Sequence, residues 1–215
     1  MEIKMKTYLF DFDGTLVDSM PIWGSVMKKI LDEASIPYGN DIIKIITPLG
    51  SLGTARHFIS MGHPLSEEEL LKKMSFYLVD EYTRNVPAKE GVIEALKKMK
   101  DRGDSLNVLT ASGHAALDPC LIRLGIFDIF DNVWSCDDFN TSKADPEIYR
   151  MAAERLGKGV GEVIFVDDNL NADMTAKKAG MTVVGIYDDS SIDYVDDIKK
   201  IADGYVYKFE ELLNM

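Results

Sequence analysis

The sequence predicts an α/β protein with a doubly wound parallel sheet and an inserted helical segment. Three short apolar runs each end abruptly in polar residues. Stretches with a helical repeat of apolar residues lie between these runs, and such alternation is typical of a parallel sheet covered on both faces. The interval 20–86 breaks the alternation, because it contains only helical patterns. We therefore expect a helical domain inserted into an α/β core.

The strand predictions rest on short apolar runs that are rich in β-formers and bounded by turn residues. The first run contains Tyr8 and Phe10 and leads directly into Asp11. Two later runs have the same pattern and lead into Thr110 and Asp167. The predicted strands are 7–10, 106–109 and 163–166, with further short strands at 132–134, 182–186 and 204–207.

Helices are predicted between these strands at 92–100, 115–124 and 146–156. The last of them stops before Gly157, a common residue just past a helix end. The acidic segment 188–197, between the last two strands, is expected to be rich in turns.

The inserted segment reads as successive amphipathic helices separated by Pro and Gly breaks, for example at 48–50 and 62–64. Ser66, followed by Glu69, predicts a helix start with a capping box. The expected domains are an α/β core formed by 1–17 and 87–215 and a helical domain at 18–86.

Composition limits the classes of partner. The chain has 215 residues, a net charge of -12 and no basic stripe, which argues against nonspecific binding to nucleic acid. Cys120 and Cys136 lie in different segments, which suits free thiols in a reducing compartment. No run of about 18 apolar residues is present, and the start of the chain lacks the apolar region of a signal peptide. We expect a soluble cytoplasmic protein without membrane or nucleic-acid partners.

Acidic residues follow two of the predicted strands. They are Asp11 and Asp13 after the first strand, and Asp167, Asp168 and then Asp173 after the strand that ends at 166. If these strands are neighbours, their carboxylates converge at one edge of the sheet, where doubly wound folds bind ligands. Like charges disfavour ionisation of such a cluster, and a hard divalent cation such as Mg²⁺ removes the conflict. The other interpretation is that these residues are loop aspartates that cap helices.

Residues 11–19, DFDGTLVDS, resemble the first motif of the haloacid dehalogenase-like superfamily, D-x-D-G-T-L-x-D-S. Thr110 resembles the second motif, Lys143 the third, and the pair at 167–168 with Asp173 the fourth. The resemblance covers nearly the whole chain, and it includes the phosphoglycolate phosphatase and β-phosphoglucomutase branch. It implies a Rossmann-like core with a helical cap between the first two motifs.

The resemblance implies a role for each motif residue. Asp11 would be the nucleophile that forms an aspartyl-phosphate, and Asp13 would be the general acid and base. Thr110 and Ala111 would bind phosphoryl oxygens, and Lys143 would neutralise both the nucleophile and the phosphoryl group.

The same resemblance implies a Mg²⁺ site. Its ligands would be Asp11, the backbone carbonyl of Asp13 and Asp168, with Asp167 acting through water. The expected reaction is Mg²⁺-dependent hydrolysis of a small phosphate ester, such as a sugar phosphate or a phosphoglycolate-like metabolite.

Two other functions stay open. A sugar-phosphate mutase of the β-phosphoglucomutase type keeps all four motifs, although the cap segment 47–54 lacks a basic residue before Arg56. A catalytically silent binding module would also preserve them. Arg56 and His57 are candidates for contacting the leaving group of the substrate. The sequence does not choose between a monomer and a homodimer, and the partner that we expect is a small phosphorylated metabolite.

Overall fold

The chain forms two compact units, as seen in a computed structural model that describes residues 5–215. One unit contains the chain up to Asp18 together with Pro87–Met215, and the other is Ser19–Val86. Within the described residues, no helix combines the length and the apolar character that crossing a membrane would need.

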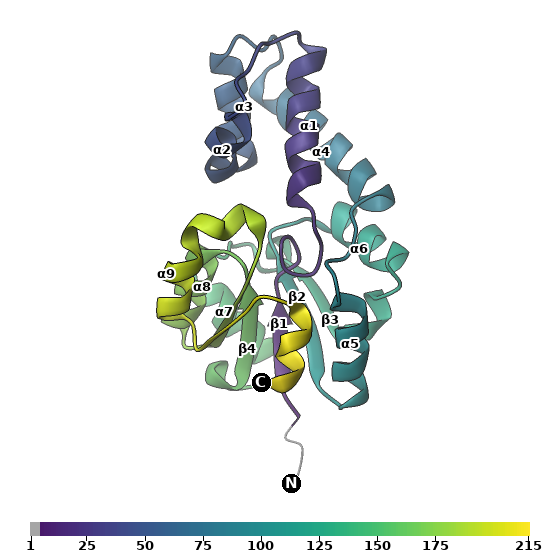
Figure 1. Ribbon diagram of the computed structural model, residues 1–215, viewed down its shortest axis with the longest axis vertical. Coiled ribbons are helices and arrows are strands. Elements are labelled where there is room, and N and C mark those ends of the chain that lie inside the picture. The colour runs from purple at the N-terminus through teal and green to yellow at the C-terminus, as the bar shows by residue number, and fades with distance from the viewer. Residues whose placement is uncertain (1–4) are drawn as a thin grey trace. The chain divides into compact units, whose positions relative to one another are not determined.

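The first unit is built on a parallel sheet with the order β3-β2-β1-β4-β5-β6. This order is that of a doubly wound Rossmann-like fold, as the sequence predicted. The sheet places β1 between β2 and β4 (Figure 1). The strands are β1 Thr7–Phe10, β2 Ser105–Thr110, β3 Asn132–Ser135, β4 Val163–Asp167, β5 Thr182–Ile186 and β6 Gly204–Val206.

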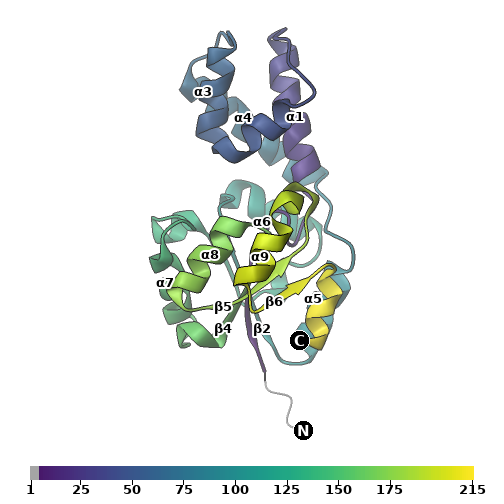
Figure 2. The ribbon, with the colours of Figure 1, turned by 60° about the vertical axis from the view of Figure 1, so that its left-hand side comes forward.

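Helices cover both faces of this sheet because consecutive side chains of a buried strand point to opposite faces. Leu9 belongs to a core cluster with residues of α7 and α8, whereas Phe10 stacks on Tyr8 and contacts the ring of Phe209. Figure 2 shows α7 and α8 on one side of the sheet and α5 on the other. The helices of this unit are α5 Val92–Asp101, α6 His114–Arg123, α7 Pro146–Arg155, α8 Leu170–Ala179 and α9 Val195–Ile201.

The sequence did not predict α9. The segment 188–197, expected to be rich in turns, contains the 3₁₀ helix Asp189–Tyr194 and the start of α9. Ile198 is its buried residue, and three apolar positions within a helix of only seven residues are too short a run for a periodic signal.

The second unit consists of the helices α1 Met20–Glu33, α2 Ile42–Ile46, α3 Gly50–Ser60 and α4 Glu67–Arg84. Its own core contains Ile30, Phe58 and Met74 from three of these helices. Glu33 of α1 pairs with Lys73 of α4 at 2.6 Å and accepts a hydrogen bond from Tyr77. The predicted capping box is present, because Ser66 accepts from the Glu69 amide and Glu69 accepts from the Ser66 amide.

The two segments that connect the units are paired with each other. Asp18 N–H donates to the carbonyl of Pro87, and Lys89 N–H donates to the carbonyl of Leu16, both at 3.0 Å. A backbone bridge joins Val17 and Ala88 in antiparallel orientation. The second connecting segment is thereby anchored to the loop that follows β1.

Candidate active site

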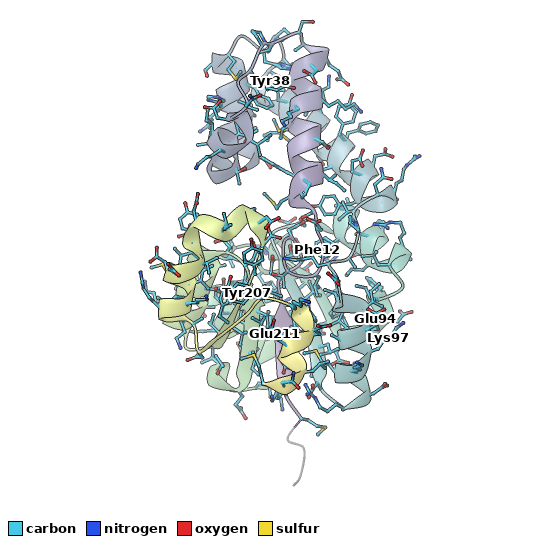
Figure 3. The ribbon with its side chains drawn as sticks, in the orientation of Figure 1. Phe12, Tyr38, Glu94, Lys97, Tyr207 and Glu211 are labelled. Carbon is cyan, nitrogen blue, oxygen red and sulfur yellow. The ribbon has the colours of Figure 1, made fainter. Side chains whose placement is uncertain are left out.

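The strand order brings the carboxyl ends of β1, β2 and β4 together at the centre of the sheet. Phe10 is paired with Val108 on one side and with Val166 on the other. The pairing continues one residue further, since Asp11 N–H donates to the carbonyl of Val166 at 2.9 Å. Phe12, which follows in the loop and is labelled in Figure 3, is fully buried and anchors the loop to the core.

Three carboxylates converge at this edge. One oxygen each of Asp11, Asp167 and Asp168 lies within 4.8 Å of the others, and all three residues are buried. Burial raises the pKa of Asp11 well above its ordinary value, although the positive charge of Lys143 lowers it. Burial also raises the pKa of Asp168 to about 8, and the neighbouring Asp167 adds to that effect. The arrangement therefore concentrates negative charge where water does not screen it.

Lys143 supplies positive charge to this cluster. Its ammonium contacts Asp11 and lies 2.8 Å from an oxygen of Asp167. Burial lowers the pKa of Lys143, but the two carboxylates outweigh that effect, and the pKa stands well above its ordinary value. Tyr149 of α7 donates to the carbonyl of Lys143 at 3.2 Å and so fixes the loop that carries it. Lys143 is therefore not a solvated surface lysine, because only 14% of its side chain is exposed.

Asp13 and Thr110 are connected through Ser112. The hydroxyl of Ser112 donates to Oδ2 of Asp13 at 2.5 Å, and its amide donates to Oγ1 of Thr110 at 3.0 Å. The Thr110 hydroxyl can still donate its own hydrogen, as a phosphate contact requires. The sequence did not assign a role to Ser112. Its position two residues after Thr110, in the loop at the same strand end, was the signal that could have identified it.

Asp173 is fully buried in the first turn of α8, and within the described chain neither of its carboxylate oxygens has a hydrogen-bond partner. Burial and the charge of Asp167 raise the pKa of Asp173 well above its ordinary value. The alternative of a helix cap does not hold here, because Asn169 caps α8 by accepting from the amides of Asn171 and Ala172.

A second set of polar groups surrounds Asp168. Thr15 donates to its Oδ1 at 3.3 Å, and Ser191 donates to its Oδ2 at 3.1 Å. Lys89 and Asp188 form an adjacent ion pair at 2.9 Å. Sequence reasoning did not assign a role to any of these four residues. Lys89 lies in a connecting segment, and Ser191 and Asp188 lie in the segment that was expected to be rich in turns.

The two other predicted site residues are exposed. Ala111 follows β2 directly and is exposed. Arg56 belongs to the second unit, where its guanidinium pairs with Glu67 at 2.7 Å and is 64% exposed.

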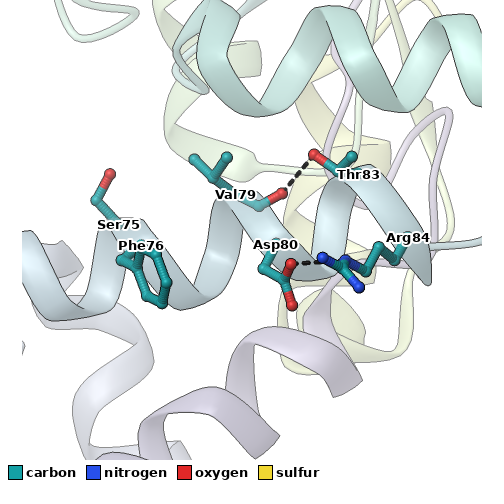
Figure 4. Close-up of a pocket in the computed structure, with 6 residues that line it drawn as sticks. All are labelled: Ser75, Phe76, Val79, Asp80, Thr83 and Arg84. Carbon is teal, nitrogen blue, oxygen red and sulfur yellow. Dashed lines mark hydrogen bonds and ion pairs between the residues drawn. The ribbon is translucent and has the colours of Figure 1, made fainter.

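A hollow of about 370 Å³ lies along α4 in the second unit (Figure 4). Asp80 and Arg84 form an exposed ion pair of 2.7 Å in its wall. Its lining contains none of the motif residues, so the chemistry is not located there. The lining residues are Ser75, Phe76, Val79, Asp80, Thr83 and Arg84.

The chain is similar to known proteins in sequence and in fold. The chain is 30% identical over 204 residues to a phosphoglycolate phosphatase of Salmonella choleraesuis, covering 82% of this chain and 79% of the relative. It is 29% identical over 186 residues to the pyrophosphatase PpaX of Bacillus velezensis, covering 85% and 83%. The fold matches that of a magnesium-bound crystal structure of the hydrolase YfnB from Bacillus subtilis, with a TM-score of 0.81, 17% identity and coverage of 98% and 97%. The haloacid dehalogenase-like hydrolase family matches residues 8–186, so the chain belongs to that family.

Proposed function

We propose that the protein is a Mg²⁺-dependent phosphatase that hydrolyses a small phosphate ester through an aspartyl-phosphate. The observation that carries the proposal is the contact of Lys143 with both Asp11 and Asp167 at the carboxylate cluster. This contact joins the third and fourth motifs to the proposed nucleophile. The relatives named as phosphatases support the same reaction class.

The donor set fits Mg²⁺. Asp11, Asp167 and Asp168 offer hard oxygen ligands within a small volume, and Mg²⁺ is commonly held by one or two carboxylates together with water and phosphate oxygens. Burial first and then the neighbouring carboxylates raise the pKa values of Asp11 and Asp168, and a bound cation would oppose both effects. When bound, the ion would neutralise phosphoryl oxygens and keep these carboxylates ionised. Asp11 and Asp168 would hold it directly with the carbonyl of Asp13, and Asp167 would act through water.

In the first step, a carboxylate oxygen of Asp11 attacks phosphorus while the ester bond breaks. Asp13 gives its proton to the departing alkoxide, which leaves as the alcohol. Lys143 and the Thr110 hydroxyl stabilise the charge on the phosphoryl oxygens, and the backbone beside Ala111 adds a contact on the same side. Because phosphoryl transfer depends mainly on positioning and charge stabilisation, these groups suffice.

In the second step, water attacks the phosphorus of the aspartyl-phosphate. Asp13, now ionised, takes the proton of that water, and the bond to Asp11 breaks to release inorganic phosphate. Ser112 supports both steps because its hydroxyl holds one oxygen of Asp13.

The proposal also gives each of the two units a role. The unit with the sheet would be the catalytic core, and Ser19–Val86 would be the cap that selects the substrate. Arg56 would contribute to that selection after leaving its exposed pair with Glu67, which costs little because surface ion pairs are weak. The expected substrate is a small phosphorylated metabolite, and the protein would act in the cytoplasm as a monomer or homodimer.

The test is the release of inorganic phosphate from a panel of small phosphate esters, with and without Mg²⁺. The native chain should release phosphate only with Mg²⁺, and Asp11→Asn should abolish release because the amide is a poor nucleophile. Asp101→Asn, which changes an exposed aspartate at the end of α5, is the matched control and should retain activity. No release from any ester by the native chain would reject the phosphatase and favour a mutase or a silent binding module.

A further inference from the structure

The side chain of Lys89 is held by three acceptors in the catalytic unit. Its ammonium donates to the carbonyl of Gly14 at 2.5 Å, to the carbonyl of Tyr187 at 2.7 Å and to Oδ2 of Asp188 at 2.9 Å. An ammonium group has three hydrogens, so its donor capacity is fully used. The side chain is only 19% exposed. Such an arrangement fixes the three acceptors relative to one another.

These acceptors belong to the two loops that enclose Asp168. The loop after β1 contains Gly14 and then Thr15, whose hydroxyl donates to Oδ1 of Asp168. The segment after β5 contains Asp188 and then Ser191, whose hydroxyl donates to Oδ2 of the same carboxylate. Lys89 therefore joins the two loops that hold opposite oxygens of one carboxylate.

Asp188 links Lys89 to the turn that carries Ser191. Its other oxygen, Oδ1, accepts from the amide and the hydroxyl of Ser190 at 2.9 and 2.6 Å, and this capping arrangement starts the 3₁₀ helix that carries Ser191. One carboxylate thus binds Lys89 and also orients the turn that reaches Asp168.

We propose that Lys89 is a positioning residue for the metal ligand Asp168. The inference rests on the proposed function, because it takes Asp168 as a ligand of Mg²⁺. Polar groups that orient metal ligands are commonly worth 10–100-fold in metal affinity. Lys89 would act through both loops, so its removal frees the two sides of the carboxylate together.

The alternative is that Lys89 contributes only to stability, as a buried ion pair. The pair of Arg102 and Asp104 is a matched control for that role. Arg102 is 20% exposed, its Nε donates to Asp104 at 2.8 Å, and its guanidinium also donates to the carbonyl of Leu213 at 3.0 Å. Asp104 precedes β2, so this pair lies at the amino end of the sheet, opposite the carboxylate cluster.

The experiment is a titration of metal-free protein with Mn²⁺, followed by electron paramagnetic resonance, because Mn²⁺ uses the same oxygen ligands as Mg²⁺. Lys89→Met should weaken the Kd for Mn²⁺ about 10-fold or more. Arg102→Met should lower the Tm of the metal-free protein but leave the Kd unchanged. Lys89→Arg should restore part of the affinity, because it keeps the charge but not the compact ammonium.

Activity gives a second readout. In Lys89→Met the Mg²⁺ concentration for half-maximal rate should rise with the Kd, whereas the rate at saturating Mg²⁺ should change by only a few-fold. Ser191→Ala alone, with Lys89 intact, should also weaken Mn²⁺ binding. The double variant Lys89→Met/Ser191→Ala should lose less binding free energy than the sum of the two single losses, because both residues act on the same carboxylate.

The outcomes separate the two proposals. If the native chain does not bind Mn²⁺, the proposed metal site is wrong. If the native chain binds Mn²⁺ and either Lys89→Met or Ser191→Ala binds it with the native Kd, the positioning role is wrong and the proposed function stands. An equal loss of affinity in Arg102→Met would also overturn the positioning role, since it would reduce the effect to general destabilisation.

Discussion

Gly14 and Asp168 lie so close that no side chain fits between them. A Cβ atom built on Gly14 would be 2.6 Å from Oδ1 of Asp168, and the φ angle of Gly14 is +77°. Glycine is therefore required at this position for two reasons: it adopts the positive φ angle, and it leaves room for the carboxylate of Asp168.

Gly14→Ala should displace Asp168, the proposed metal ligand, and lower Mg²⁺-dependent activity about 10–100-fold, because the ligand would lose its orientation. Gly125→Ala is the matched control. Gly125 also has a positive φ, +70°, but a Cβ atom there would meet nothing within 4 Å. Both variants should lose stability, measured as Tm, and only Gly14→Ala should lose metal affinity. Similar kinetics for the two variants would contradict this explanation.

Lys143→Met should lower kcat about 100-fold or more, because it removes the positive charge from both Asp11 and the phosphoryl group. Steady-state kinetics at saturating Mg²⁺ would measure the effect. Lys143→Arg should remain impaired, since the planar guanidinium does not occupy the place of a compact ammonium between two carboxylates. A variant with Met at this position that turns over at the native rate would exclude Lys143 from the chemistry.

Removal of the divalent ion should destabilise the protein. Because a ligand that binds only the folded state stabilises it by mass action, Mg²⁺ at about 100 times its Kd should add about 2.7 kcal/mol to the free energy of unfolding. Thermal unfolding of chelator-treated protein, with and without added Mg²⁺, measures the difference. In Asp168→Asn the stabilisation by Mg²⁺ should shrink, whereas in the exposed-site control Asp101→Asn it should persist.

His114 should make stability depend on pH. Its ring contacts Asp118 at 2.8 Å and Asp138 at 2.9 Å, and hydrogen bonds to these two carboxylates raise its pKa above the ordinary value. A raised pKa in the folded state means that the stabilisation is fully present below the unfolded value of about 6.5 and is lost as pH rises through the folded value.

The check is the Tm of the native chain and of His114→Gln from pH 5.5 to 9. The native protein should be the more stable near pH 6, and the difference should shrink as pH rises above neutrality. A difference that grows with pH would show that the sign of the linkage is opposite. His57, on the second unit, offers the control substitution His57→Gln, which removes a histidine without touching this contact.

Ser66→Ala should lower the stability of the second unit by about 1 kcal/mol, because it removes the side-chain half of the capping box of α4. Chemical unfolding followed by circular dichroism measures the change. Ser75→Ala, in the middle of the same helix, is the control and should be neutral or slightly stabilising because Ala favours helices. Equal effects of the two substitutions would show that the cap does not matter.

The strands and the motif residues could be predicted because their signals are local. Each buried strand is a short apolar run, and the residues that follow at 11, 110 and 167 are set by where that run ends. The parallel sheet then brings these positions together, since all carboxyl ends lie on one edge. The joining of Lys143 to the same cluster depended on the resemblance, because a lysine in a loop has no periodic signal.

The surroundings of Asp168 could not be predicted in the same way. Lys89, Asp188 and Ser191 reach the site from segments that are far apart in sequence, and each is an ordinary polar residue in its own segment. Their roles follow only from the packing of the loops. The buried Asp173 shows the same limit, because its position in the first turn of a helix is also typical of a favourable dipole interaction.

The position of β1 at the centre of the sheet affects how the chain can be made. β1 is synthesised before the other strands of its sheet, yet Phe10 must pair with Val108 and Val166, which emerge from the ribosome much later. Until then Tyr8, Leu9 and Phe10 form an apolar segment without neighbours, and such segments are prone to aggregation. The second unit is continuous in sequence and has its own core, so it can fold before the strands that pair with β1 have been synthesised. Asp11, the proposed nucleophile, is thus synthesised well before Asp167 and Asp168, and the carboxylate cluster can form only after those residues have emerged.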